Sequence, residues 1–138
     1  MTLQHRYSLP WLVCLMFAAS CNIVDPPVVS PGIAVISLIA APGAPGAFLL
    51  ELSGGSTITS VATANGAYQL RSSRLNGATV QVFLRGNLSV GAVLRVGVSD
   101  KSRLPQVRVL EAVSTRAAGY TIQNPQNYTL QSVAAGSE

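Results

Sequence analysis

The sequence is poor in the side chains that perform most protein chemistry. Beyond residue 21 it contains no histidine, tryptophan, methionine or cysteine, because the single His and Trp are His5 and Trp11 and the cysteines are Cys14 and Cys21. This excludes Ser/His/Asp and Cys/His catalysis from that part of the chain, together with zinc and copper sites built from imidazole or thiolate. The two cysteines share one apolar segment, which would hold them too far apart for a disulfide.

Charged residues are also scarce, at 10% of the chain against 49% hydrophobic residues. Soluble domains usually carry about 25% charged residues, so this chain must bury much of itself or lie near a membrane. Of nine basic residues only Arg6 precedes Cys21, which leaves eight basic against five acidic residues. A net charge this small is not that of a nucleic-acid-binding protein, and we expect no nucleic-acid partner.

The few acidic residues are scattered. A two-carboxylate enzyme could draw only on Glu51, Asp100 and Glu111, and carboxylates at this low density are most often surface solubilisers. Residues 99–102, "SDKS", offer one acid and two hydroxyls, which is a poor calcium site. We therefore expect no enzymatic activity, no cofactor and no metal.

The N-terminus has the three-part layout of a secretory signal. Residues 1–8 carry a positive charge and no acid, and residues 9–19 are apolar except for Pro10. This run of about a dozen residues is shorter than the roughly 20 that a membrane-spanning helix needs. We predict that residues 1–20 form a signal helix that is removed, with an uncleaved membrane anchor as the weaker alternative.

The residues at the expected cleavage site resemble the lipobox of bacterial lipoproteins. They read Ala18, Ala19, Ser20, Cys21, with Ala18 where Leu is commoner. The resemblance implies cleavage between Ser20 and Cys21, a diacylglyceryl thioether on the Cys21 sulfur and acylation, typically by palmitate, of the new amino terminus. Several acyl chains hold a protein firmly on a membrane, whereas one does so only marginally. The alternative is an ordinary signal peptide with a chance cysteine near its cleavage site.

The same resemblance implies a location. The protein would lie in the bacterial cell envelope, with the membrane as its partner through the lipid on Cys21. Asn22 follows the cysteine, where Asp is the inner-membrane retention residue of Gram-negative lipoproteins. In a Gram-negative cell this favours the outer membrane.

A proline-rich segment follows the expected cleavage site. Residues 21–32 contain three prolines and end in glycine, which favours an extended, stiff tether. The alternative, a first strand that includes Val28 and Val29, is disfavoured by the adjacent proline pair. We expect the folded domain to span residues 33–135 and residues 136–138 to be a disordered tail.

The remaining chain is patterned as short strands separated by turn residues. Apolar positions alternate or run together over segments bounded by Gly, Pro, Asn and Ser, at spacings of about 8–12 residues. No segment has helical spacing over three turns. We therefore predict an all-β fold, a single antiparallel β-sandwich of about eight or nine strands. The expected strands are 33–40, 48–53, 57–64, 67–72, 78–85, 92–99, 106–114, 120–123 and 128–134.

Some of these segments carry finer predictions. Segment 33–40 is almost wholly apolar, which suits a strand buried on both faces or at a sandwich core, and the Thr-rich segment 57–64 suits an edge strand. Asn65–Gly66 is a strong hairpin signal leading into the next strand. In segment 106–114 the valines at 107, 109 and 113 should face inward, but alternation also turns Glu111 inward. We expect a β-bulge or strand end there.

The alternating segments 78–85 and 92–99 suggest a surface. If they pair with both apolar faces directed inward, the remaining alternate residues gather on the outer face. A Phe–Arg neighbourhood of this kind is either an ordinary cross-strand contact or part of a recognition surface. The four residues of this possible outer-face binding surface are Phe83, Arg85, Val93 and Arg95.

Two segments carry a resemblance to a known fold. "GAFLLELSG" (46–54) and "GAVLRVGVSD" (91–100) resemble strands of cohesin-like and other immunoglobulin-like bacterial sandwiches, and are similar to those of small envelope lipoproteins. Cohesins bind a protein partner through an exposed sheet face, so the resemblance implies a sandwich that binds protein.

The expected function is therefore that of a lipid-anchored envelope protein, a noncatalytic structural or protein-binding module. The alternative is a module that binds carbohydrate or a cell-wall polymer, which would need exposed aromatic side chains. Those available beyond the signal are few, and we expect Phe48 and Tyr68 to be buried, which favours a protein partner. The full set is Phe48, Tyr68, Phe83, Tyr120 and Tyr128.

Overall fold

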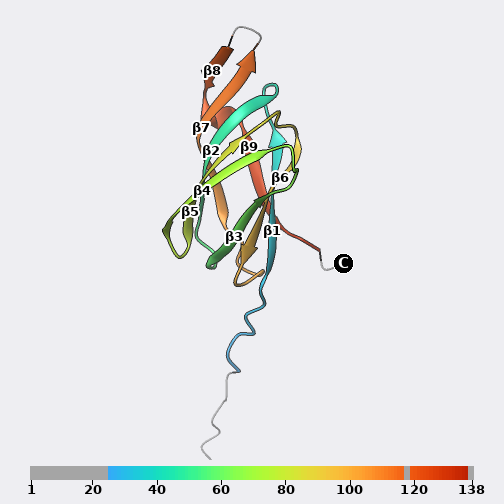
Figure 1. Ribbon diagram of the computed structural model, residues 1–138. Coiled ribbons are helices and arrows are strands. Elements are labelled where there is room, and N and C mark those ends of the chain that lie inside the picture. Colours follow the sequence, from blue (N-terminus) through green and yellow to red (C-terminus); the bar gives the residue numbers. More distant parts are fainter. Residues whose placement is uncertain (1–24, 117–118, 137–138) are drawn as a thin grey trace, which may run out of the picture.

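The computed structural model describes residues 25–116 and 119–136. They form two antiparallel sheets packed face to face, so the predicted all-β sandwich is confirmed (Figure 1). No helix in these ranges is long and apolar enough to cross a membrane. The elements are β1 (Gly32–Ala40), β2 (Pro45–Ser53), β3 (Ile58–Thr63), β4 (Gln69–Asn76), β5 (Thr79–Arg85), β6 (Gly91–Val98), β7 (Gln106–Arg116), β8 (Gly119–Gln123), the 3-10 helix η1 (Pro125–Asn127) and β9 (Thr129–Ala134).

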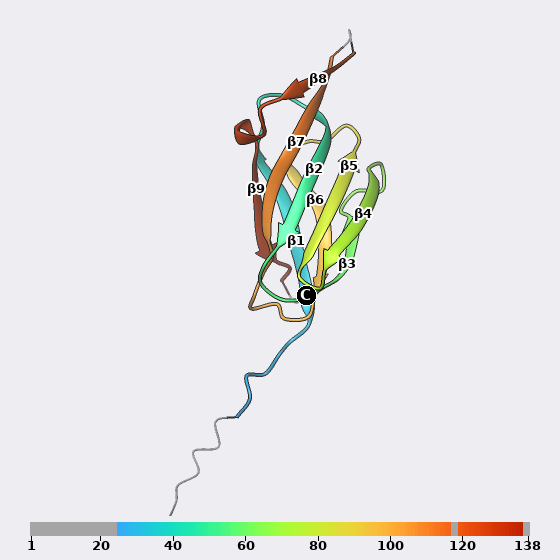
Figure 2. The same ribbon diagram turned by 90° about the vertical axis from the view of Figure 1, so that its left-hand side faces the viewer.

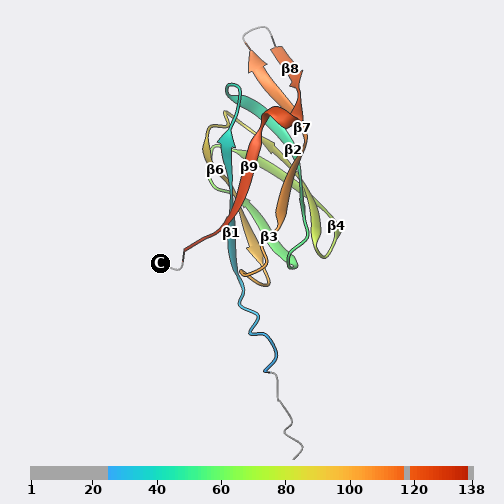
Figure 3. The ribbon, with the colours of Figure 1, turned by 180° about the vertical axis from the view of Figure 1, so that it is seen from behind.

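The chain changes sheet at most of its connections. One sheet has the order β3-β6-β1-β9 and the other β4-β5-β2-β7-β8. Figure 2 turns the five-stranded sheet toward the viewer, and Figure 3 shows β9 lying along β1 on the opposite side. Only β4–β5 and β7–β8 are both consecutive and paired. Sequence neighbours therefore usually face each other across the core.

The core comes from the inward face of each alternating strand. Phe48, Leu50 and Leu52 of β2 are fully buried, as predicted from their spacing. On β1 only one face is buried, because Ile33 and Ile39 remain 41% and 49% exposed on the other. A run of apolar residues does not by itself distinguish these two situations. The other buried core residues are Ala34, Ile36, Leu38, Ile58, Val80, Val82, Leu84, Leu88, Val93, Leu94, Val96, Val98, Ala112 and Tyr128.

The expected pairing of β5 with β6 is wrong. β5 pairs with β2 and β4, whereas β6 pairs with β1 and β3 in the other sheet. The connection crosses the end of the sandwich, where buried Leu88 donates its backbone N–H to the Pro45 carbonyl oxygen at 3.2 Å. β5 and β6 direct their apolar faces to the same core from opposite sheets. This buries the apolar residues of each strand as well as direct pairing of the two strands would.

The expected bulge at Glu111 is confirmed. The β2–β7 register passes from Leu50 opposite Val109 to Leu49 opposite Glu111, which leaves Leu110 as the extra residue. Glu111 therefore turns outward. Beyond the bulge the alternation is reversed, so Ala112 is buried and the prediction that Val113 points inward is wrong.

Asn65–Gly66 does not form the expected hairpin. β3 and β4 belong to different sheets, and Asn65 instead accepts a hydrogen bond from the Ala67 amide at 2.9 Å on its side-chain oxygen. A second Asn–Gly pair, Asn76–Gly77, lies at the β4–β5 hairpin, where the Asn76 side chain binds the Ala78 amide at 2.9 Å. Both asparagines form the same local turn. The strands that the turns connect differ, because β3 and β4 lie in different sheets whereas β4 and β5 pair with each other.

The chain enters the sandwich at one end. Val28 and Val29 lie before β1, outside any strand, and are 90% and 59% exposed. The Ser30 carbonyl oxygen accepts a hydrogen bond from the Lys101 amide at 2.8 Å, which fixes the start of β1 to the loop after β6. We call this end of the domain the base; the β7–β8 hairpin lies at the other end (Figure 1).

Candidate functional site

The structure separates the four residues of the expected outer-face surface. Phe83 and Arg85 are exposed on the outer face of the five-stranded sheet, as predicted. Val93 is fully buried, because the β1–β6 register skips it between the partners of Ile36 and Ser37. At such a bulge two successive side chains share one face, so Val93 joins Leu94 in the core. Arg95 is exposed on the other sheet. Ser20 and Cys21 lie outside the described residues.

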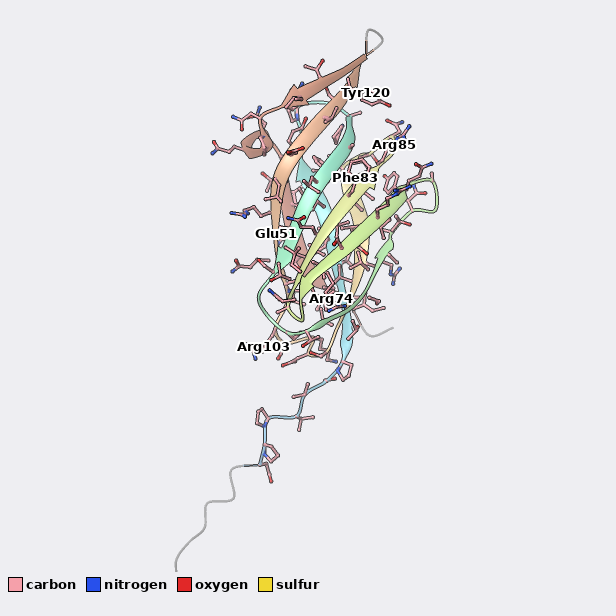
Figure 4. All side chains as sticks on the ribbon, turned by 60° about the vertical axis from the view of Figure 1, so that its left-hand side comes forward. Glu51, Arg74, Phe83, Arg85, Arg103 and Tyr120 are labelled. Carbon is pink, nitrogen blue, oxygen red and sulfur yellow. The ribbon has the colours of Figure 1, made fainter. Side chains whose placement is uncertain are left out.

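Phe83 and Arg85 belong to a patch that four strands build. Ala47 on β2 lies opposite both Arg85 on β5 and Val113 on β7. Val113 in turn lies opposite Ile122 on β8, and alternation places Tyr120 on the same face as Ile122. We define Ala47, Phe83, Arg85, Val113 and Tyr120 as the distal patch, because it lies toward the end of the sheet remote from the base (Figure 4).

The distal patch surrounds a hollow of about 330 Å³. Its rim is mainly apolar, with Phe83 43% and Tyr120 67% exposed. Ile122 is 84% exposed on the adjoining strand. Exposed apolar side chains that form a contiguous patch, rather than lying singly, can mark a binding surface.

Arg85 links this hollow to two others. It lines a second one with Gln69, Leu70, Arg71 and Phe83, and a third with Gly46, Gly86, Asn87 and Tyr120. Figure 4 shows Arg85 between Phe83 and Tyr120. An arginine that lines one hollow with two aromatic residues can bind a carboxylate or a carbonyl group while its stem covers apolar surface.

The one ion pair among the described residues lies on the same face, nearer the base. Arg108 Nη2 donates to Glu51 Oε1 at 3.0 Å, with 69% and 21% of the respective side chains exposed. Exposed pairs of this kind contribute at most about 1 kcal/mol to stability. Arg85 is the one charged residue of the distal patch, and exposed Glu111 lies two strands from Phe83 on the same face, because Leu49 is opposite both.

Asp100 stabilises a loop at the base through hydrogen bonds of its side chain. Its carboxylate accepts hydrogen bonds from the Ser102 hydroxyl at 2.7 Å and the Ser102 amide at 3.0 Å, and these bonds lower the pKa of Asp100 below its usual value. Across residues 25–116 and 119–136 no three His, Cys, Asp or Glu side chains gather where a metal ion could bind.

Tyr120 and Ile122 were not expected on the same surface as Phe83 and Arg85. Their signal was the alternation in "GYTIQ", which places both on one face of β8, but nothing local showed that β8 would continue the sheet that carries Phe83. No family model, no curated protein and no solved structure matches the chain.

Proposed function

We propose that this chain is a lipid-anchored, noncatalytic protein-binding module of the bacterial cell envelope. The lipid would be carried by Cys21, and the distal patch would bind the partner. The observation that carries the proposal is the position of the patch. Exposed Phe83 and Tyr120 flank Arg85 toward the end of the domain remote from the tether, which is the end that a membrane-anchored domain presents to its surroundings.

The chemistry of the patch favours a protein surface with apolar and acidic groups. Tyrosine and arginine are enriched among the residues that dominate protein–protein affinity, and they lie centrally in such interfaces. Here the aromatic rings supply apolar area, and Arg85 supplies donors for a partner carboxylate. Ile122 on the neighbouring strand would extend the same apolar area.

Noncatalytic function is supported by how two of the three candidate carboxylates are used. Glu51 binds Arg108, and Asp100 binds Ser102 within its own loop. Glu111 is the third, exposed on the outer face. We expect the triple change Glu51→Gln, Asp100→Asn, Glu111→Gln to leave the cellular phenotype intact, and loss of the phenotype in a folded triple variant would contradict the noncatalytic assignment.

Binding by the distal patch is tested by crosslinked affinity capture from envelopes. Tyr120→Ala and Arg85→Ala should each reduce capture of the specific partner by about tenfold, as expected when a central interface residue is truncated. The matched control is Arg95→Ala, which changes another exposed arginine, on the opposite sheet. Equal losses in all three variants would show that the distal patch is not the binding site.

The lipid anchor is tested separately by metabolic labelling with palmitate. The wild-type chain should incorporate label and fractionate with membranes, whereas Cys21→Ala should do neither. Ser20→Ala serves as a control that keeps a small residue before the cysteine. Equal labelling of wild type and Cys21→Ala would end the lipoprotein assignment but leave the protein-binding assignment untouched.

A second candidate function is binding of carbohydrate or a cell-wall polymer. Two exposed aromatic rings around one hollow favour it, because sugars stack on aromatic faces. Sedimentation of the purified chain with insoluble peptidoglycan distinguishes the two functions. Retention that Phe83→Ala and Tyr120→Ala both abolish would favour the polymer, and no retention would favour the protein partner.

A further inference from the structure

A hollow of about 530 Å³ lies on the outer face of β4 and β5. It is lined by Gln69, Leu70 and Arg71 of β4 and by Phe83 and Arg85 of β5. We call it the β4–β5 hollow. It shares Phe83 and Arg85 with the distal patch, whereas Gln69 and Arg71 do not belong to that patch. A second arginine therefore gives this hollow a chemistry that the distal patch lacks.

The register of the two strands places two arginines around one aromatic ring. Arg71 lies directly opposite Phe83, and Gln69 lies directly opposite Arg85. Opposite residues of an antiparallel pair direct their side chains to the same face, and all four of these residues are exposed. Arg71 and Arg85 are therefore diagonal neighbours on the outer face, roughly 7–8 Å apart, a separation that long side chains can span.

No described carboxylate pairs with either arginine. The lining of the hollow contains no acid, and the one ion pair among the described residues joins Arg108 to Glu51. Glu111 lies on the same row of the sheet as Phe83, but β2 separates their strands. At a strand spacing of about 4.8 Å, this places the backbone of Glu111 roughly 10 Å from that of Phe83. Two positive charges are therefore neighbours without a counter-charge, which is unfavourable until an anion binds between them.

The hollow is built on strands whose backbone is held in place. Leu70 packs against the core. Gly86, which follows Arg85, donates its backbone N–H to the Gly46 carbonyl oxygen at 3.0 Å. A Cβ atom at Gly86 would lie 2.9 Å from the Tyr68 ring, so the chain is closely packed there. Sites built on strands hold their side chains in place more precisely than sites on loops.

We propose that the β4–β5 hollow binds a phosphate monoester, with the phosphate between Arg71 and Arg85 and the organic group that carries it against Phe83. The guanidinium N–H groups donate to the phosphate oxygens, and the side-chain amide of Gln69 is a further donor. One guanidinium suffices for a carboxylate, whereas a phosphate monoester carries a charge of about −1.5 to −2 at neutral pH and three acceptor oxygens. It therefore matches two arginines in both charge and number of hydrogen bonds.

A sugar phosphate and a lipid headgroup offer the same phosphate chemistry. Figure 4 shows Arg85 far from Arg103, which belongs to the loop at the base. A headgroup in the membrane that holds the tether would lie near the base, a point that rests on the proposed lipid anchor. The position of the hollow therefore favours a sugar phosphate. Its binding would compete with the protein partner of the distal patch, because both use Phe83 and Arg85, a consequence that rests on the proposed function.

The test titrates the full chain in neutral detergent with glucose-6-phosphate. Its matched control is glucuronate, which carries a carboxylate at the same carbon. Nuclear magnetic resonance signals of the Arg71 and Arg85 side chains report binding at the hollow. We expect glucose-6-phosphate to bind at least about tenfold more tightly than glucuronate. Its affinity should fall several-fold from about pH 7.5 to about pH 5, because the phosphate gains a proton with a pKa of about 6, whereas the affinity for glucuronate should not change.

Variants of the protein locate the site. Arg71→Gln and Arg85→Gln should each weaken glucose-6-phosphate binding by about tenfold. The matched control Arg95→Gln changes an exposed arginine of the opposite sheet and should leave the affinity unchanged. Tyr120→Ala separates this proposal from protein binding, because Tyr120 lines the hollow of the distal patch but not the β4–β5 hollow. It should reduce capture of the protein partner and leave phosphate affinity intact, and Arg71→Gln should do the opposite.

A short-chain phosphatidic acid, used in place of glucose-6-phosphate, distinguishes the two sources of the phosphate. Tighter binding of this lipid, lost in Arg71→Gln, would support the site and assign its ligand to a lipid headgroup. Tighter binding of glucose-6-phosphate would assign it to a sugar phosphate. Equal affinity for glucose-6-phosphate and glucuronate, equal losses in Arg71→Gln and Arg95→Gln, or no change in the two arginine signals would overturn the proposal.

Discussion

The two long sides of the sandwich are closed in different ways. On the side of β3 and β4, Arg74 donates to the Ile58 carbonyl oxygen at 2.7 Å, and the Ile58 amide donates to the Gly77 carbonyl oxygen at 3.2 Å. Both backbone groups of Ile58 therefore bind the opposite sheet. On the side of β7 and β9 the closure is apolar, with the Tyr128 ring against Phe48 at 5.1 Å between centroids.

The two sides also differ in how their edge strands are covered. A charged side chain that reaches across the gap satisfies backbone groups and blocks the edge at the same time. Tyr128 fills space but satisfies no edge, and its burial raises the pKa of its hydroxyl. We refer to these as the closed side and the open side.

The largest expected effect tests the packing of the open side. Phe48→Ala removes a fully buried ring and its contact with Tyr128, so the free energy of unfolding should fall by about 3–5 kcal/mol. Urea denaturation measures it. The matched control is Leu84→Ala on β5, one strand nearer the closed side, with an expected loss of about 2–5 kcal/mol. A loss at Phe48 well below that at Leu84 would mean that the open side is loosely packed.

The next effect tests the hydrogen bonds of the closed side. Arg74→Met keeps an apolar stem but loses the bonds to the Ile58 and Gly77 carbonyl oxygens, and should lower the free energy of unfolding by about 1–2 kcal/mol. Arg71→Met on the same strand is the control, with an expected change within about 0.5 kcal/mol. If the two variants unfold alike, Arg74 does not close that side.

A smaller effect concerns the base, where the carboxylate of Asp100 holds a loop. Because hydrogen bonds from Ser102 lower the pKa of Asp100 below 3.8, the folded state binds its proton more weakly than the unfolded state. The contribution is present above pH 3.8 and is lost as the pH falls through the lower, folded-state value.

Asp100→Asn should therefore lower the melting temperature slightly at neutral pH, and the difference from wild type should shrink as the pH falls below 3.8. Thermal unfolding followed by circular dichroism at several pH values measures it. Arg74→Met, by contrast, should cost the same at each pH. A pH-independent difference for Asp100→Asn would show that its charge has no part in holding the loop.

The smallest effect concerns the β7–β8 hairpin, at the end of the domain remote from the base. Ile122 is 84% exposed on β8, so Ile122→Lys should change the free energy of unfolding by no more than about 0.5 kcal/mol. Val82→Lys, at a fully buried position of β5, is the contrasting control and should prevent folding. A substantial loss at Ile122 would indicate that β8 packs against more than its exposure shows.

The positions of the strands could be predicted because each depends on local pattern. Turn residues limit the segments, and the side-chain period of two identifies the buried face of β2 and β5 before any partner is known. The bulge at Glu111 was predictable for the same reason, since a charge that falls on an apolar face must be moved out of it.

The pairing of strands was not predictable in this way. Val93 was assigned to the surface because β6 was expected to lie beside β5, whereas the bulge opposite β1 turns it into the core. The two Asn–Gly pairs form similar local turns, yet only Asn76–Gly77 connects two strands that pair with each other. Of the four residues expected on one outer face, only Phe83 and Arg85 lie on it together.

Alternation, turns, the apolar start of the chain and the absence of histidine and cysteine beyond residue 21 are properties of the sequence alone, because each is read within a few residues. The gathering of Tyr120 with Phe83 and the free edge of β9 are properties of the folded chain. An alternating strand can bury its apolar face in two arrangements. The next strand in the sequence can pair with it in the same sheet, or can face it across the core from the other sheet. Which of these occurs depends on packing over the whole domain, and that packing produced both the distal patch and the groove between β7 and β9.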